Sequence, residues 1–180
     1  MIWRSKIEID EKIHLEEHNT EWFKMFELEK FNLCESLGNV VLGIEHIGST
    51  SIPDIYAKPI VDILIGVKCL PLHESQINKI MELDYEYLGE TGVRGRLYFR
   101  KRYPQAYNVH ITQIGSEIWN NNIILRDYLI NHKYEANIYS DLKRNILTDG
   151  VDTLLEYSYR KHNFISELLK KANKWYNISS

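Results

Sequence analysis

Two apolar runs, separated by a loop of small, hydroxyl-bearing and proline residues, constrain the fold more than any other feature of the chain. The runs are VVLGIEHI at residues 40–47 and IVDILIGV at residues 60–67, and the loop GSTSIPDIYAKP joins them. Short apolar runs bounded by Gly and Pro are typical of buried strands. The sequence therefore predicts two core strands with a structured loop between them.

Helical and strand patterns alternate over the rest of the chain. A helix is expected at residues 19–38, with Asn19 or Thr20 as its cap and Gly38 as its stop. The further expectations are a helix around 73–83, strands around 86–90, 94–102 and 107–114, and helices at 123–132, 135–147 and 151–175. This order predicts an α/β (α+β) fold in which helices flank a mixed β-sheet and the C-terminal third is helical.

Helical spacing also predicts which side chains face inward. On the first helix these are Trp22, Phe23, Phe26, Leu33 and Leu37. On the last helix the expected apolar stripe is Leu155, Ser158, His162, Ile165, Leu169 and Ala172. Its position on this stripe makes His162 a core histidine rather than a ligand, and Trp119 and Trp175 are expected in the core as well.

Length and composition limit the possible functions. With 180 residues, of which 44% are hydrophobic, the chain suits one domain over residues 1–180. A formal net charge of −3 argues against a protein that coats nucleic acid or an anionic membrane, and no apolar run is long enough for a membrane span. Because only two cysteines occur and the opening residues contain no apolar signal region, we expect a cytoplasmic location. Nothing in the sequence predicts an oligomeric state.

The loop between the two strands has the composition of a phosphate-binding site. Gly48 has no side chain to block the approach of an anion to the backbone N–H groups, and the hydroxyls of Ser49 and Thr50 add donors. Lys58 supplies a point charge near the end of the loop. The alternative is an ordinary turn that binds nothing.

Asp62 is the only ionisable residue in the second apolar run. An unpaired charge in a buried strand costs several kcal/mol, so this carboxylate needs a metal ion, a cation or a donor from a ligand. The alternative is a structural ion pair with a neighbouring Lys or Arg. On the residues alone, both interpretations stay open.

The segment HIGSTSIPDIYAKPIVDI resembles the signature of the GrpB family, in which His-x-Gly-Ser-Thr precedes a Pro-containing turn, Ala-Lys-Pro and an Asp in a buried strand. Further segments similar to the family follow along nearly the whole chain. They are EWFKMFELEK, RLYFRK, NVHIT, LRDYLINH, YSDLKRNI and YSYRKHNFI. The resemblance implies a nucleotidyltransferase-like fold, with Gly48 and Ser49 at the Gly-Ser turn and Asp62 as the first metal-binding carboxylate.

The chain departs from active nucleotidyltransferases at Leu64. Enzymes of this class carry a second acid two residues after the first, so that both side chains leave one strand face and hold Mg²⁺. The candidates to replace it are His110, which with Asp62 would be catalytic and metal-binding, and His46 or Glu45 as further ligands. Histidine suits Mn²⁺ or Zn²⁺ better than Mg²⁺. The expected cofactors are a divalent ion, Mg²⁺ or Mn²⁺, and a nucleoside triphosphate.

Asp54 is a second departure, because the family tends to have Gly at this position. Its carboxylate would add negative charge near the phosphate loop, or it would cap the turn.

A row of basic residues lies in the strand expected at residues 94–102. Strand alternation places Arg94, Arg96, Tyr98, Arg100 and Arg102 on one face and Val93, Leu97 and Phe99 on the other. One interpretation is phosphate recognition, above all by Arg96, with Tyr98 as a surface for stacking a base. The other is an exposed edge strand that its charges keep from pairing.

Two further charged pairs lie in the C-terminal helices. Lys161 is one helical turn from Tyr157, and the family resemblance places it beside the phosphate site, whereas the pattern alone fits a solvated pair equally well. Arg126 and Asp127 are expected to form an ion pair from helix to sheet.

Two functions follow from these residues. The first is metal-dependent transfer of a nucleotidyl group onto a small acceptor. The residues expected to bind its phosphates are Gly48, Ser49, Thr50, Lys58, Arg96 and Lys161. The alternative, which Leu64 favours, is a non-catalytic nucleotide- or phosphometabolite-binding module that has lost the second carboxylate. A different phosphotransfer or hydrolysis through His110 is a third possibility. In each case the expected partner is a small phosphate-bearing molecule.

Overall fold

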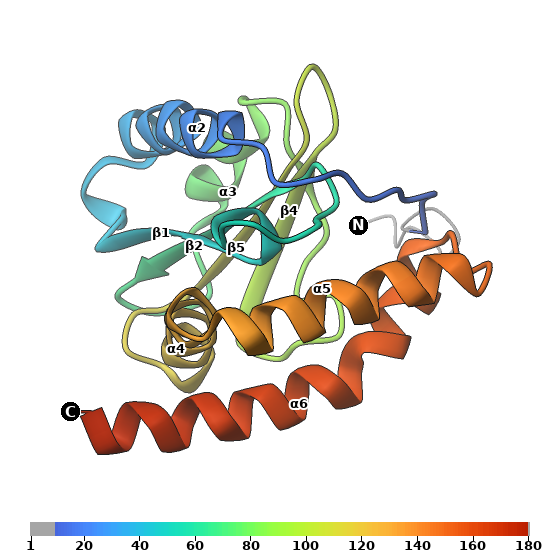
Figure 1. Ribbon diagram of the computed structural model, residues 1–180. Helices are drawn as coiled ribbons and strands as arrows, with labels where there is room; N and C mark the ends of the chain where they lie inside the picture. The colour runs from blue at the N-terminus through green and yellow to red at the C-terminus, as the bar shows by residue number, and fades with distance from the viewer. Residues whose placement is uncertain (1–9, 180) are drawn as a thin grey trace.

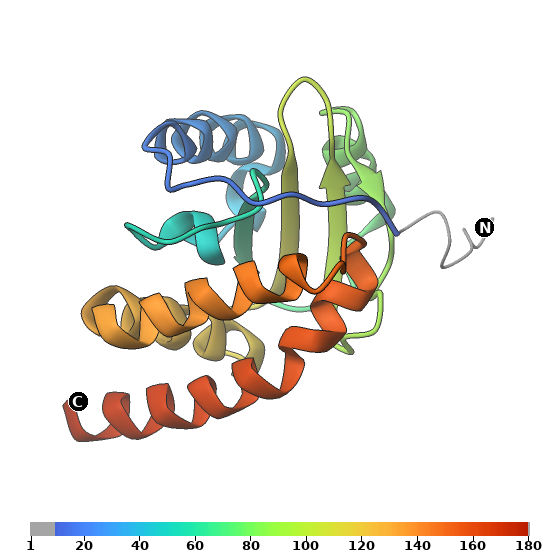
Figure 2. The same ribbon diagram turned by 45° about the vertical axis from the view of Figure 1, so that its right-hand side comes forward.

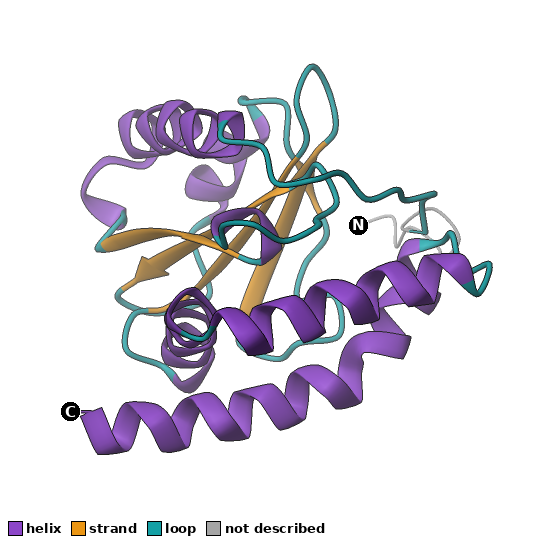
Figure 3. Ribbon diagram, viewed as in Figure 1, coloured by secondary structure: helices purple, strands orange, loops and turns teal. Residues whose placement is uncertain are grey.

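The computed structural model describes residues 10–179, and residues 10–178 with their side chains. Its strands are β1 (Gly43–Ile47), β2 (Val61–Val67), β3 (Glu86–Tyr87), β4 (Arg96–Lys101) and β5 (Tyr107–Gln113). Its helices are α2 (Glu21–Leu37), α3 (Glu74–Met81), α4 (Glu117–Asn131), α5 (Lys133–Thr148) and α6 (Leu154–Ser179), with short 3₁₀ turns η1 (Gly38–Val40) and η2 (Ser49–Ser51). The expected α/β fold with a helical C-terminal third is confirmed (Figure 3).

The five strands form one mixed sheet in the order β1-β2-β5-β4-β3. β2 and β5 are parallel, and the other neighbouring pairs are antiparallel. In the parallel pair, Asp62 lies opposite Asn108, and Leu64 lies opposite His110. Because side chains alternate along a strand, these four residues share one face of the sheet.

The opposite face carries the larger core and is covered by α2 and α3 (Figure 1). Trp22, Phe26 and Leu33 of α2 are buried there, as helical spacing predicts. The helix is capped by Asn19, whose Oδ1 accepts a hydrogen bond of 2.9 Å from the N–H of Glu21. Phe23 was expected inside but is 62% exposed, because it lies one residue, or about 100°, around the helix from the buried Trp22.

On the Asp62 face, α4 covers the far end of β1 and β2. The indole of Trp119 lies against Gly43 and Gly66, which are directly paired across these strands. Leu64 and Ile47 pack against the same indole. This end of the face is therefore apolar core, and the polar residues lie at the other end of β2.

Helices α5 and α6 enclose the loop between β1 and β2. Ile52 and Ile55 of the loop belong to one apolar cluster with Tyr139 of α5 and Leu168 of α6. Figure 1 shows α4, α5 and α6 on the side of the sheet away from α2. No helix within residues 10–179 is long and apolar enough to cross a membrane.

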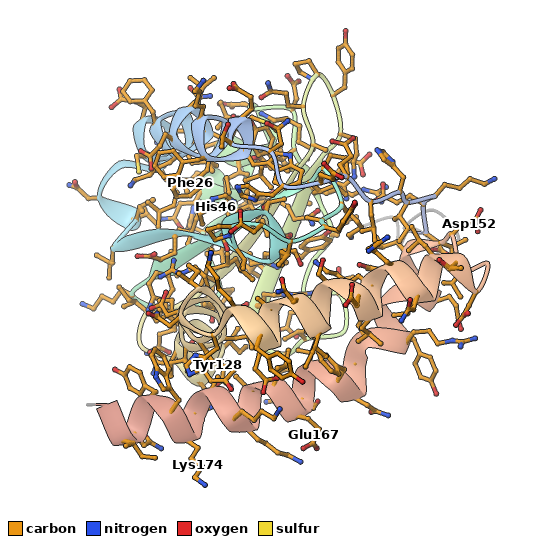
Figure 4. All side chains as sticks on the ribbon, in the orientation of Figure 1. Phe26, His46, Tyr128, Asp152, Glu167 and Lys174 are labelled. Carbon is orange, nitrogen blue, oxygen red and sulfur yellow. The ribbon has the colours of Figure 1, made fainter. Side chains whose placement is uncertain are left out.

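The buried stripe of α6 differs from the expected one. The fully buried residues are Tyr157, Leu168 and Ala172. The expected Leu155, Ser158 and His162 are exposed, so His162 is not a core histidine. Glu167 and Lys174 mark the exposed side of the helix (Figure 4). In the second half of the helix the expectation holds, since Ala172 is buried and Ile165 packs against the buried cluster. It fails in the first half, where contacts with segments remote in sequence decide which side chains are buried.

Three element boundaries also differ from expectation. β3 has two residues rather than five, because Gly89, Thr91 and Gly92 adopt positive φ and turn the chain. β4 begins at Arg96, which leaves Arg94 in the preceding turn. α4 begins at residue 117 rather than 123, because the hydroxyl of Ser116 accepts a hydrogen bond from the N–H of Trp119 and caps the helix.

The segment before α2 runs in front of the sheet and ties the loop to α6 (Figure 2). Isolated bridges join Glu16 to Ala57 in the loop, and Lys12 to Thr153 just before α6. The carboxylate of Glu11 accepts hydrogen bonds from Arg102 Nε at 2.9 Å and Nη2 at 2.8 Å. This bidentate ion pair fixes the segment to the end of β4.

Gly66→Ala is expected to lower the free energy of unfolding by about 1–3 kcal/mol, as overpacked cores do. The new methyl group would lie 2.8 Å from Trp119 Cζ3 and 3.0 Å from Ile114 Cβ. Urea unfolding measures the change. In a Trp119→Leu background the smaller side chain gives room, so the same substitution should cost less. An equal cost in both backgrounds would contradict the close fit of the indole.

Candidate metal and anion site

Asp62 lies at the start of β2 and is held by two residues of β5. Asn108 Nδ2 donates a hydrogen bond of 2.7 Å to Asp62 Oδ1, and His110 Nε2 lies 3.5 Å from the same oxygen. The parallel pairing of β2 with β5 brings these side chains together. The prediction that Asp62 and His110 share a face within reach of a common ion is confirmed.

The Asp62 carboxyl remains ionised at any pH near neutral. Burial acts to raise its pKa, but the hydrogen bond and charge of His110, the charge of Lys58 and the hydrogen bond from Asn108 outweigh it and lower the pKa to about 2. The side chain is 26% exposed, so it is also open to a ligand.

A second layer of hydrogen bonds orients Asn108. Its Oδ1 accepts from the hydroxyl of Tyr98 at 2.8 Å and from Arg102 Nη2 at 3.0 Å. With its oxygen taken by two donors, the amide must present its NH₂ group to Asp62. Since Arg102 is itself held by Glu11, a continuous chain of contacts runs from the N-terminal segment to the carboxylate.

Gly48 follows β1 and lies directly against Asp62. Its φ of 72° is in the left-handed region, and a Cβ at this position would lie 2.4 Å from Asp62 Oδ2. Both facts require glycine. Within the described part of the chain, the N–H groups of Gly48, Ser49 and Thr50 donate to no protein acceptor. Three consecutive donors therefore remain available beside the carboxylate.

The hydroxyl groups of the loop are used differently from one another. Ser49 Oγ lies 3.5 Å from the hydroxyl of Tyr139 on α5. Thr50 is 3% exposed, and its Oγ1 lies 2.9 Å from His46 Nε2. Only the backbone N–H of Thr50 is therefore placed to meet an anion, whereas Ser49 can offer both its N–H and its hydroxyl.

Three lysines from three segments gather next to this loop. Lys58 comes from the loop, and its ammonium lies 5.9 Å from the ring centre of Tyr157. Lys161 of α6 lies 4.5 Å from the same ring, and Lys143 of α5 lies 4.5 Å from the ring of Tyr139. Within residues 10–178 none of the three has a carboxylate within 4.0 Å.

The lysines act on one another electrostatically. Burial and the charge of Lys161 lower the pKa of Lys58 to about 8, against the opposing effect of Asp62. Burial and the charges of Lys161 and Lys58 lower the pKa of Lys143 to about 7. This concentration of positive charge lies at the loop between β1 and β2, around the rings of Tyr139 and Tyr157.

Lys143 was missed as a site residue by the sequence reasoning. Its segment YSDLKRNI was noted only as part of the family resemblance. The available signal was a lysine four residues after Tyr139, on the same side of a helix whose buried residues include both. Helical spacing places Lys143 on the same stripe as the buried Tyr139, and an ionisable residue on such a stripe is a signal of a functional position.

His46 does not join the Asp62 and His110 pair. Ile47 is the residue opposite Asp62, so alternation turns His46 to the other face of the sheet. There its ring stacks on Phe26 at 4.9 Å (Figure 4). Burial, only partly opposed by the charge of Asp62, lowers the pKa of His46 to about 4, so it is neutral near pH 7. Glu45 lies on the Asp62 face but is paired with Arg126 of α4 at 2.6 Å.

Two of the four arginines in the row, Arg100 and Arg102, are engaged in ion pairs. Arg100 pairs with Glu86 at 2.8 Å, Arg102 pairs with Glu11, and β4 lies inside the sheet rather than at its edge. Arg96 differs, because its Nε is buried and has no partner within the described residues. Its guanidinium lies 5.1 Å from the ring of Tyr98, which itself stacks on His110 at 5.2 Å.

The remaining charged residues singled out in the sequence are structural. Arg126 joins α4 to β1 through Glu45 and the carbonyl of His46, as well as to its neighbour Asp127. Asp54 has a φ of 63°, which explains why glycine suits this position, and its carboxylate lies 3.2 Å from Lys133.

Asp62 and His110 can supply two ligands to one ion. Their 3.5 Å separation fits two donors on a shared ion, since metal–ligand bonds to nitrogen and oxygen are about 2.0–2.2 Å long. Within the described residues, no group of three or more His, Cys, Asp or Glu side chains could hold a metal ion. The donor set therefore fits an open site, in which the ion completes its shell with water and ligand oxygens, and not a closed structural site. The imidazole favours Mn²⁺ over Mg²⁺.

Fold and site together define a mixed α/β protein with an acid and a histidine beside a Gly-Ser loop. The family model described as GrpB protein matches residues 12–171, and the chain belongs to the GrpB family.

Individual relatives agree with this assignment. The glutamate-rich protein GrpB of Alkalihalophilus pseudofirmus is 31% identical over 86% of this chain and 92% of its own length. The UPF0157 protein YqkA of Bacillus subtilis is 33% identical over 91% of this chain, which spans 48% of that protein. The crystal structure of the conserved protein GrpB from Enterococcus faecalis matches with a TM-score of 0.79 and 32% identity, over 91% of this chain and 99% of that one.

Leu64→Asp tests whether the missing second acid can be restored. Leu64 is 0% exposed and packs against Trp119, so the new carboxylate should destabilise the fold by roughly 3–5 kcal/mol, as an uncompensated buried charge does. Leu64→Met is the control and should cost less than about 1.5 kcal/mol. A Leu64→Asp protein with a normal unfolding midpoint and tighter Mg²⁺ binding would refute this.

Stability should fall as the pH drops from about 6.5 toward 4. The folded pKa of His46 is about 4 and its ordinary value is 6.5, so the unfolded chain takes up the proton first. In this window His46 can contribute a slope of up to about 1.4 kcal/mol per pH unit. Urea unfolding at several pH values should show a shallower slope for His46→Gln. The exposed His162→Gln should match the unmodified protein, and identical slopes in all three would contradict the assignment.

Proposed function

We propose that this chain binds a nucleotide or another phosphate-bearing metabolite together with one divalent metal ion. The observation that carries the proposal is the arrangement of charge around Gly48. Free N–H groups and lysines without carboxylate partners lie on one side, and Asp62 with His110 lies on the other. Donors and cations of this kind bind phosphate, and a metal ion would prevent repulsion between the phosphate and Asp62.

Each part of the site has its own role in this proposal. The N–H groups of the loop hold phosphate oxygens, and the nearby cations balance their charge. The residues assigned to phosphate are Gly48, Ser49, Thr50, Lys58, Arg96 and Lys161. Arg96 is included because its buried Nε lacks a protein partner, which a ligand oxygen would supply.

Asp62 and His110 are the proposed metal ligands. A bound Mg²⁺ or Mn²⁺ would neutralise phosphate charge and polarise a phosphoryl oxygen. Asn108 keeps Asp62 Oδ1 turned toward His110, and Tyr98 supports the imidazole by stacking on it. These contacts fix both ligands before any ion arrives, which reduces the entropy lost on binding.

Nucleotidyl transfer onto a small acceptor is the second candidate function, favoured by the contact between Asp62 and His110 and by the implied nucleotidyltransferase-like fold. The acceptor oxygen would bond to the α-phosphorus, the bond to the bridging oxygen would break, and pyrophosphate would leave. His110 is placed to take the proton of the acceptor. The buried Leu64 favours binding without transfer, since no second carboxylate can enter at that position.

Asp62→Asn is expected to fold and to lose the metal response. With wild-type protein, Mn²⁺ should raise the thermal midpoint further when a nucleotide is present, because a ligand of the native state adds stability by mass action. Asp62→Asn should show no such metal-dependent increase. Asp54→Asn, on the same loop but exposed and paired with Lys133, is the matched control and should behave like wild type.

A collapsed midpoint for Asp62→Asn without ligand would contradict the metal role and indicate a structural ion pair. Mass spectrometry of nucleoside triphosphate, Mn²⁺ and a panel of small acceptors separates the two candidate functions. Pyrophosphate released by wild type but not by Asp62→Asn indicates transfer. Binding without turnover indicates a non-catalytic binding module.

A further inference from the structure

The burial of Lys143 lacks the compensation that other buried charges in this protein receive. Its side chain is 1% exposed, and no carboxylate within residues 10–178 lies within 4.0 Å. Glu29, at 3% exposed, shows the usual solution, since Lys101 Nζ lies 2.5 Å from its carboxylate. An unpaired buried cation is costly, so Lys143 calls for an explanation.

The contacts of Lys143 reduce this cost only in part. Its ammonium donates to the carbonyl of Tyr56 and lies 4.5 Å from the ring centre of Tyr139. A single hydrogen bond and one aromatic face leave two of its three donors unused. Lys161 and Lys58 act on it with the same sign of charge, so the charged groups near its ammonium repel it.

We propose that Lys58, Lys143 and Lys161 together bind a group of two or more linked phosphates, and that they do so without a metal ion. The three ammonium groups come from the loop, α5 and α6 and lie over the rings of Tyr139 and Tyr157. The Tyr139 hydroxyl lies 3.5 Å from Ser49 Oγ, and the charge of Lys58 acts on Asp62, which touches Gly48. This inference rests on the proposed function, because it names the part of the ligand that the cationic side of the site recognises.

Charge balance favours linked phosphates over a single one. One phosphate group carries about −1.5 to −2 charges at pH 7, which is less than three lysines require. Two linked phosphates balance all three and span more than one ammonium group. Lysine suits this role, because its ammonium is a point charge with rotatable donors and does not require the fixed geometry of an arginine fork.

Inorganic pyrophosphate and the phosphate chain of a nucleotide share this chemistry. Isothermal titration in EDTA at pH 7 and low salt, with pyrophosphate, orthophosphate, tripolyphosphate and ATP as probes, distinguishes them. Pyrophosphate should bind at least tenfold more tightly than orthophosphate. Binding of ATP tighter than that of tripolyphosphate, which has the same number of linked phosphates, identifies a nucleotide as the ligand, and equal binding of the two identifies the phosphate chain alone.

Lysine variants then locate the binding site. Lys143→Met and Lys161→Met should each weaken pyrophosphate binding at least tenfold. Lys133→Met is the matched control, since this residue is also on α5 but is 82% exposed and pairs with Asp54. It should bind pyrophosphate as wild type does. If Lys143→Met fails to fold, Lys161→Met decides, because Lys161 is only partly buried.

Proton uptake separates a ligand contact from a structural role for Lys143. With a pKa of about 7, this lysine is largely neutral at pH 8, and a bound anion would make it take up a proton. Titrations in two buffers of different ionisation enthalpy measure this uptake, which Lys143→Met should reduce. The ionisable groups of its surroundings are Lys58, Lys161, Tyr56, Tyr139 and Tyr157.

The outcomes distinguish this inference from the proposed metal site. Equal affinity for orthophosphate and pyrophosphate, or unchanged affinity in Lys161→Met, would overturn the lysine site. Asp62→Asn should bind pyrophosphate in EDTA at least as tightly as wild type, because a nearby negative charge has been removed. If wild type binds pyrophosphate in EDTA but Mn²⁺ does not raise its thermal midpoint with nucleotide, the proposed metal site is wrong and the lysine site stands.

Discussion

The parallel pairing of β2 with β5 is the constraint on which the rest of the site depends. It sets Asp62 opposite Asn108 and one step from His110, so one sheet register fixes both the carboxylate and its partners. Gly48 can then approach only because it has no side chain, and its close contact brings the loop N–H groups to the same place. A register shift of one residue would turn Asp62 into the core under α2.

The two faces of the sheet differ in whether their buried charges have partners. The α2 face keeps its buried acid, Glu29, paired with Lys101, whereas the loop face collects lysines that have no such partner within the described residues. Unpaired buried charge lowers stability, and it persists where it serves binding. In the proposed function, the unpaired lysines of the loop face bind phosphate, whereas the paired charge of the α2 face contributes to stability alone.

The sequence predicted what local pattern controls and failed where distant partners decide. Asp62 and His110 were predicted to share a face because both are polar residues in otherwise apolar strands, and the pairing of β2 with β5 confirms it. Glycine and hydroxyl residues marked the loop. The side of the sheet that His46 faces follows from the pairing of Ile47 with Asp62, which the sequence does not reveal. The sequence could not place Lys143 beside Lys58 and Lys161, because α5, α6 and the loop meet only in the fold. It also could not show that Arg100 pairs with Glu86 and Arg102 with Glu11.

The chemistry of the site is divided between two parts of the chain. Asp62 and His110 belong to the sheet, whereas Lys143 and Lys161 belong to helices that follow all five strands. Substitutions in α5 and α6 can therefore alter the number and spacing of cations without disturbing the acid and the histidine. Under the proposed function, changes in these two helices would alter the phosphate-bearing ligand while the central strands remain the same.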